Sequence, residues 1–155
     1  MMKKILKNQK GLTLIELLAV IVILGIIAAI AVPAIGNIIA NSERKADLTE
    51  ASQIIGSAKL YIASEGPTFD PSANTLKITK AADGSLSYLP TGNTGFEGYL
   101  DKSDAFELTI TKNGGALTFS IDAHPSTEDY AQPGLSPAHV KGAALSETQI
   151  ETLIR

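Results

Sequence analysis

The sequence predicts an α+β protein in which a long N-terminal helical spine packs on a small antiparallel β-sheet head. Two patterns predict this fold. The chain is almost continuously apolar from residue 12 to about residue 40. Farther along, polar and apolar residues alternate in short runs between turn-forming residues, which is typical of antiparallel strands. The 155 residues suffice for one compact domain in addition to the spine.

The first eleven residues carry four lysines and no acidic residue. Positive charge beside an apolar segment stays on the cytoplasmic side, so we expect the N-terminus inside and the rest of the chain outside. As a helix, Leu12 to Ile30 would be about 28 Å long, close to the thickness of a bilayer's hydrocarbon core. The sequence therefore predicts a single membrane-spanning helix.

One carboxylate, Glu16, interrupts the apolar run, and no Lys, Arg or His lies between Leu12 and Asn41. A charge at the bilayer centre costs about 2.5–3.5 kcal/mol on insertion scales, so such a residue is usually paired or functional. We expect the partner to come from another chain. The α-amino group that cleavage after Gly11 would create on Leu12 is the obvious cation. The alternative is an interfacial carboxylate that tilts into the headgroups and has no further role.

The segment Lys10–Leu18, with sequence KGLTLIELL, resembles the class III signal of type IV pilins and the related pseudopilins. The resemblance implies that a prepilin peptidase cuts after Gly11 and N-methylates Leu12, where the family usually has Phe. It also implies that Glu16, with Thr13 in the same motif, acts in assembly by pairing with a neighbouring subunit's terminal amine.

Two further positions match the family pattern: Gly25 and Pro33. The resemblance implies that the helix between them loses order inside the filament. Pro33 alone predicts a kink, because it lacks an N–H and clashes with the preceding turn, so a simply kinked anchor is the alternative. A competing interpretation is an ordinary secretory signal peptide cut near residues 29–31. The length of the apolar run and the presence of Glu16 argue against it.

We expect three parts in the chain: a leader at 1–11 that is removed, a spine at 12–66 whose apolar part is 12–40, and a β-rich head at 67–155. The second half of the spine has an apolar stripe at helical spacing. The stripe consists of Leu48, Ala51, Ile55, Ala58 and Ile62, with Ile54 and Tyr61 beside it. Gly66 and Pro67 predict the end of the helix.

The clearest strand signal is a hairpin in which 106–110 and 117–121 flank the turn Asn113–Gly115. We expect its apolar face to lie on the helical stripe. Residues 85–89 predict another strand, 76–79 a strand or a helical turn, and 91–98 a glycine-rich loop. After a loop at 124–142, Ser146 and Gln149 predict a capping box that opens a C-terminal helix.

Few residues suggest chemistry. There is no cysteine and no Walker, GxSxG or HExxH motif, so we predict neither an enzyme nor a cofactor or metal site. His124 and His139 match no zinc spacing and are expected to be solvated loop residues. Four aspartates could supply calcium ligands but lack EF-hand spacing, so calcium binding is left open. They are Asp101, Asp104, Asp122 and Asp129.

The sequence therefore predicts a structural subunit of a type IV pilus that assembles as a helical homo-oligomer at the cell surface. The alternatives are a pseudopilin of a secretion or competence machine and a monomeric membrane-anchored binding module. The expected partners are the prepilin peptidase, the assembly machinery and, before assembly, membrane lipid. With a net charge of −3, nucleic acid binding is possible but unsupported.

Overall fold

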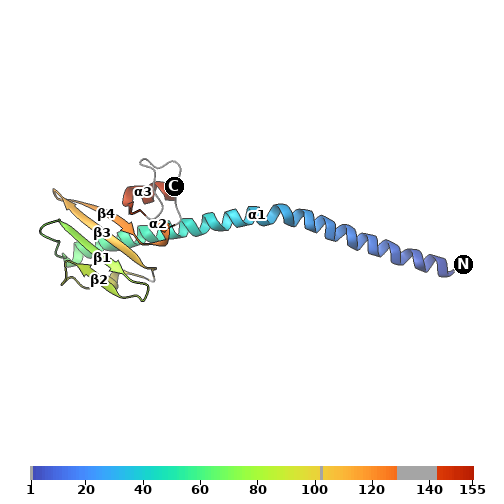
Figure 1. The fold of residues 1–155 in the computed structure, drawn as a ribbon, viewed down its shortest axis with the longest axis horizontal. Coiled ribbons are helices and arrows are strands. Elements are labelled where there is room, and N and C mark those ends of the chain that lie inside the picture. The colour runs from blue at the N-terminus through green and yellow to red at the C-terminus, as the bar shows by residue number, and fades with distance from the viewer. Residues whose placement is uncertain (1, 102, 129–142) are drawn as a thin grey trace. The chain divides into compact units, whose positions relative to one another are not determined.

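The computed structural model describes residues 2–101, 103–128 and 143–155, except for the side chains of residues 2–13. The chain forms two compact units, Met1–Ser42 and Glu43–Arg155. Helix α1, Met2–Glu65, contributes to both units (Figure 1).

Helix α1 ends where the sequence predicts. Gly66 has a φ of 57°, and its N–H donates to the carbonyl of Ile62 at 3.2 Å, which is the usual geometry of a glycine that closes a helix. At the other end, the backbone is helical from Met2, so the lysine-rich leader continues the helix. The helix also runs without interruption through Pro33, and the kink at this residue stays a prediction.

The second unit contains a five-stranded antiparallel sheet in the order β2-β1-β3-β4-β5 (Figure 1). The strands are β1 (Thr75–Lys80), β2 (Leu86–Leu89), β3 (Phe106–Asn113), β4 (Ala116–Asp122) and β5 (Leu145–Ser146). The predicted hairpin is confirmed as β3 and β4, with Asn113 opposite Ala116. Gly114 and Gly115 both have positive φ, as a two-residue turn of this kind requires. Residues 76–79, for which the sequence predicts either a strand or a helical turn, belong to strand β1.

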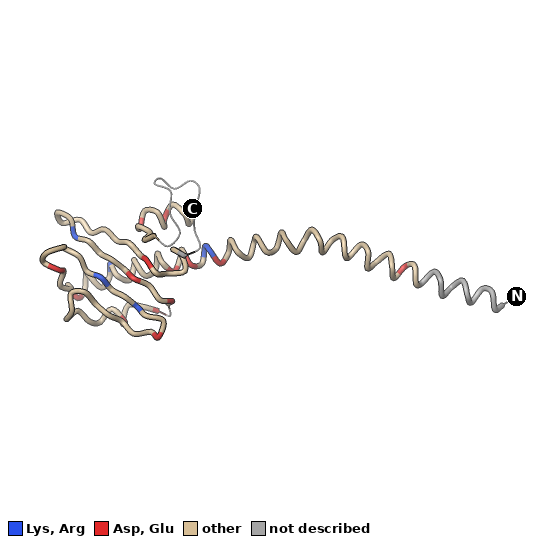
Figure 2. Tube along the Cα trace, in the orientation of Figure 1, with Lys and Arg blue, Asp and Glu red and all other residues tan. Residues whose placement is uncertain are grey.

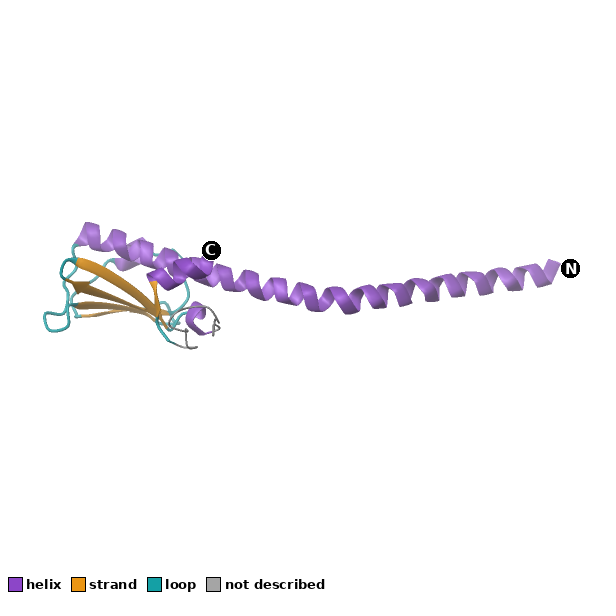
Figure 3. Ribbon diagram, turned by 90° about the horizontal axis from the view of Figure 1, so that it is seen from above, coloured by secondary structure: helices purple, strands orange, loops and turns teal. Residues whose placement is uncertain are grey.

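The core of this unit lies between the sheet and the second half of α1, which covers one face of the sheet (Figure 3). The predicted helical stripe is buried except for Ile62, which is partly buried. The sheet contributes Leu76, Ile78, Phe106, Leu108, Ile110, Phe119, Ile121 and Leu145. Tyr61 packs edge-on against Phe96 at 5.4 Å between ring centroids, and Phe96 packs edge-on against Phe106 at 6.4 Å.

The segment that follows α1 is anchored through Asn93, which is 8% exposed. Its side-chain oxygen accepts a hydrogen bond from the backbone N–H of Thr68 at 2.9 Å. Its amide nitrogen donates to the carbonyls of Thr68 and Pro90, each at 3.0 Å. One polar side chain thus satisfies backbone groups of two loop segments that would otherwise lose their water partners.

Helix α3, Glu147–Ile154, confirms the predicted C-terminal helix. Ser146 is its N-cap, and the reciprocal bonds of a capping box with Gln149 are present. Leu145 and Ile150, on either side of the cap, are both buried in the core. Glu147 also forms an ion pair with Lys59 of α1, so α3 is held to α1 as well as to the sheet.

Three short elements differ from the sequence prediction. The predicted loop at 91–98 runs into a 3₁₀ helix, η1 (Phe96–Tyr99). The predicted loop from residue 124 begins with a helical turn, α2 (Pro125–Glu128). Leu145 and Ser146 join the sheet as β5, paired with Ile121 and Ser120. Two of these elements depend on residues far away in the sequence, since β5 pairs with β4 and Phe96 of η1 packs against Tyr61 of α1. The hydrogen bonds of the α2 turn are local, between His124 and residues 126 and 127.

Candidate processing and assembly site

The candidate site lies in the first unit and is carried by helix α1 alone. Glu16 is exposed, and no hydrogen bond or ion pair of its carboxylate is found among residues 14–101, 103–128 and 143–155. This agrees with the absence of a cation in the sequence from Leu12 to Asn41. The chain itself therefore offers Glu16 no charged partner in the described part.

The side chains around Glu16 are large, apolar and exposed. Leu14 is 68% exposed and Ile21 is 58% exposed, and the other bulky residues of this stretch are similar. An 18-residue window of α1 reaches a mean hydropathy of 3.0, and none of it is buried, so the helix is long and apolar enough to cross a membrane. A helix that is apolar on every side needs lipid or other protein around it.

The backbone of Gly11, Leu12 and Thr13 is helical as part of α1, whereas the side chains of these residues fall outside the described part. The predicted roles of Gly11, Leu12 and Thr13 therefore remain predictions.

Gly25 and Pro33 both lie inside α1. A Cβ added at Gly25 would meet no atom within 4 Å, so packing within the chain does not require a glycine there. A glycine inside a helix costs roughly 0.5–1 kcal/mol relative to alanine. The cost is therefore not offset by any contact of the described residues, which leaves the predicted role in weakening the helix open.

Residues 6–32 match the family model described as the prokaryotic N-terminal methylation motif. Over 117 residues the chain is 36% identical to the type IV major fimbrial protein FimA of Dichelobacter nodosus, and this match covers 74% of each chain. The chain belongs to the type IV pilin family.

Two further FimA sequences from Dichelobacter nodosus match shorter parts of this pilin. One is 50% identical over 46 residues, or 30% of each chain, and the other is 39% identical over 75 residues, or 44% of each chain. No solved structure matches the chain significantly. The family is structural and not enzymatic, in agreement with the prediction from the sequence, and the α+β fold with an apolar N-terminal helix is the fold predicted for a pilin.

The head of this pilin contains a buried titratable group that the sequence did not reveal. The sequence predicts a solvated His124, but this prediction is wrong, because its side chain is 0% exposed. It follows β4 directly and lies against the α1 residue Glu50, with 3.6 Å between Nε2 and a carboxylate oxygen. Burial lowers the pKa of His124, although the carboxylates of Glu50, Asp47 and Asp104 act in the opposite direction. His139, the other histidine that the sequence predicts to be solvated, lies outside the described residues.

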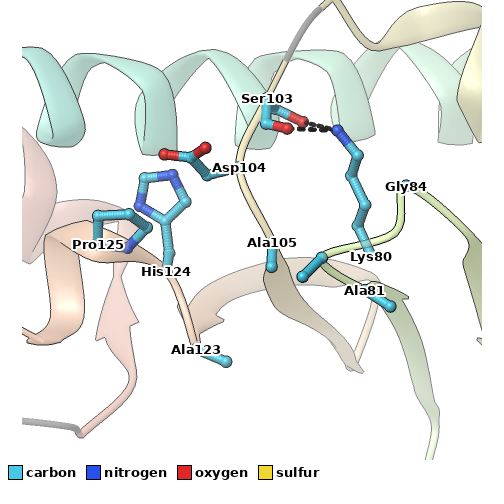
Figure 4. A pocket seen from close by; sticks show the side chains of 10 residues that line it. Lys80, Ala81, Gly84, Ser103, Asp104, Ala105, Ala123, His124 and Pro125 are labelled. Atoms are coloured by element: carbon cyan, nitrogen blue, oxygen red, sulfur yellow. Dashed lines mark hydrogen bonds between the residues drawn. The ribbon is translucent and has the colours of Figure 1, made fainter.

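A pocket of about 580 Å³ lies beside His124 (Figure 4). Its lining is mostly small residues, together with Lys80, Ser103 and Asp104. The ammonium group of Lys80 donates to the hydroxyl of Ser103 at 2.8 Å and to the carbonyl of the same residue. Among the residues that the structure describes, no three side chains of His, Cys, Asp or Glu are grouped so that they could hold a metal ion.

Proposed function

We propose that this pilin is made as a membrane-anchored precursor, cut after Gly11, N-methylated on Leu12 and assembled into a helical filament at the cell surface. In the precursor the leader lies on the cytoplasmic side, and α1 crosses the membrane once. The leader at 1–11 is removed by a prepilin peptidase. The assembly machinery then transfers the apolar half of α1 from lipid to the filament core.

The observation that carries this proposal is the surface of the first unit. It combines exposed apolar side chains with one carboxylate, Glu16, that has no partner among the described residues. Sister helices would cover the apolar surface, and one of them would provide the terminal ammonium of its own Leu12. Inside such a bundle, each charge needs the other, because a buried charge that has lost its partner is strongly destabilising. The same carboxylate would therefore favour correct register between subunits.

The proposal predicts that Glu16→Ala abolishes incorporation into filaments while the protein remains stable in the membrane. Glu43→Ala is the matched control, because Glu43 is an exposed glutamate of the same helix beyond the apolar run. Filaments sheared from the cells would be quantified by electron microscopy, and membrane levels by immunoblotting. Normal filaments from the Glu16→Ala variant would overturn the assigned role.

Processing is tested separately by the intact mass of protein extracted from membranes. We expect a chain that begins at Leu12 and carries one methyl group, and Gly11→Ala should leave the chain uncut. An uncut wild-type chain would favour the monomeric anchored module. Long native fibres containing this chain would favour the pilus over the pseudopilin, and the similarity to a major fimbrial protein supports the pilus.

A further inference from the structure

His124 lies where several elements of the head meet. The residue connects β4 to α2, its side chain lies against α1, and the segment 103–105 passes beside it (Figure 4). The neighbouring residues of α2, Ser126 and Thr127, are also fully buried. A change in the charge of the imidazole would therefore act on several elements at once.

The hydrogen bonds of His124 fit a neutral imidazole. The backbone N–H of Ser126 donates to Nδ1 at 3.1 Å, and the hydroxyl of Ser126 lies 2.9 Å from the same nitrogen. A nitrogen that accepts an N–H bond carries no proton, so the proton of the neutral ring is on Nε2. The carbonyl of His124 in turn accepts bonds from the backbone and hydroxyl of Thr127, both at 2.8 Å. Together these bonds fold the α2 turn over the ring.

The other ring nitrogen of His124, Nε2, faces carboxylate groups. Nε2 makes no hydrogen bond with any residue that the structure describes. It lies 3.6 Å from Oε1 of Glu50, the same oxygen that accepts the N–H of Asp104 at 2.7 Å. The carboxylates of Asp47 on α1 and Asp104 before β3 also act on the ring. The lysine that lines the pocket, Lys80 of β1, is bonded to Ser103. The charged groups around the ring therefore attract a proton, while burial and the bond from Ser126 oppose it.

We propose that His124 is an acid-sensitive lock of the pilin head: its neutral ring holds the α2 turn against α1, and protonation releases that turn. A proton on Nδ1 would face the N–H of Ser126, so the bond between them would be lost. The charged ring would then turn toward the carboxylate of Glu50. The sheet, whose core is apolar, would remain folded.

The sign of the pH effect follows from burial. Because the pKa of His124 is lower in the folded head than the value of about 6.5 in an unfolded chain, the unfolded chain binds the proton more strongly. The contribution of neutral His124 to stability is complete above about pH 6.5. It decreases as the pH falls below that value and stops changing below the folded-state pKa. One proton can change the folding equilibrium by at most about tenfold per pH unit.

The lock is tested with the full chain in detergent micelles between pH 8.0 and pH 5.5. His124→Gln and His139→Gln each leave one of the two histidines, so the second variant is the matched control for the first. The free energy of unfolding of the head, measured with denaturant, should decrease as the pH falls in the wild type and in His139→Gln. In His124→Gln this loss, up to tenfold per pH unit in the folding equilibrium, should be absent. Equal pH dependence in the two variants would overturn the proposal.

A second measurement does not depend on the folding of His124→Gln. In His139→Gln, the NMR signals of the remaining imidazole should titrate with a midpoint below 6.5, and Glu50→Gln should move that midpoint lower still. After correction for intrinsic rates, the amides of Ser126 and Thr127 should exchange faster at pH 5.5 than at pH 8.0, relative to those of Leu108 and Ile110. A titration midpoint at or above 6.5 would contradict the lock. So would the same change in exchange rate between pH 8.0 and pH 5.5 in all four amides.

Discussion

The two halves of helix α1 place their apolar residues in opposite environments. In the half that belongs to the head, apolar residues form one stripe that the sheet covers, and Ile55 is 2% exposed. In the half that precedes it, apolar residues lie on every side of the helix, and Ile27 is 56% exposed. The apolar surface of the half in the head is covered by the sheet of the same chain, whereas that of the preceding half requires lipid or other subunits to cover it.

Charge divides the helix in the same way (Figure 2). From Leu12 to Asn41 the only charged residue is Glu16, whereas five of the eight residues from Glu43 to Glu50 are charged. Charged side chains around a stripe keep the opposite face of the helix in water. The comparison therefore teaches that one helix serves two kinds of interface, and that the change from one to the other occurs near Ser42.

The sharpest test of this comparison is the same substitution in each half. Ile55→Ala should reduce the free energy of unfolding of the head by about 2–5 kcal/mol, because it removes buried methyl groups and leaves a cavity. Ile27→Ala should leave that free energy unchanged, because Ile27 belongs to the first unit and is not one of the residues that form the head's core. Denaturant unfolding in detergent, followed by the near-UV circular dichroism of the tyrosines, measures both. A large loss in Ile27→Ala would refute the division.

The next largest effect is expected at Asn93, which holds the loop after α1. Asn93→Ala should destabilise the head by about 1–3 kcal/mol, because the backbone groups of Thr68 and Pro90 lose their partner in a buried place. Asn37→Ala, an exposed asparagine in the apolar half, should change the same unfolding curve by less than about 0.5 kcal/mol. Equal curves for the two variants would show that the loop anchor is unimportant.

A smaller effect is expected at the start of α3. Ser146→Ala removes the N-cap and should destabilise the head by about 1 kcal/mol. Ser87→Ala, at an exposed position of β2, provides the control and should change stability by less than about 0.5 kcal/mol. Thermal unfolding in detergent compares the two. If the loss were the same in both variants, the capping box would not explain the stability of α3.

The smallest effect again uses a matched pair, Gly25→Ala and Gly56→Ala. Both glycines lie in α1 with no atom near an added Cβ, so each substitution should stabilise the local helix by about 0.5–1 kcal/mol. Only Gly56→Ala should raise the unfolding free energy of the head. Only Gly25→Ala should make filaments less extensible, as measured by pulling single filaments. Identical extensibility in wild type and Gly25→Ala would remove the proposed role of Gly25.

Local patterns predicted the elements whose stability is largely local. The β3–β4 hairpin follows from alternation and from a turn with two glycines, and α3 follows from its capping box. The burial of the stripe on α1 follows from helical spacing. The burial of His124 could not be predicted in this way, because it depends on Glu50 and Asp104, which are distant in the sequence. The pairing of β5 with β4 has the same cause, since two residues carry no strand signal of their own.

The sequence by itself determined the long apolar helix, its lone carboxylate, the motif that indicates cleavage after Gly11, and the kind of fold. These features follow from composition and from spacing along the chain, which do not depend on distant contacts. Only the tertiary structure decided which polar groups of the head lose water. Burial of His124 and Asn93 arises when segments far apart in the sequence close over them, and a group's charge and hydrogen bonds depend on that enclosure.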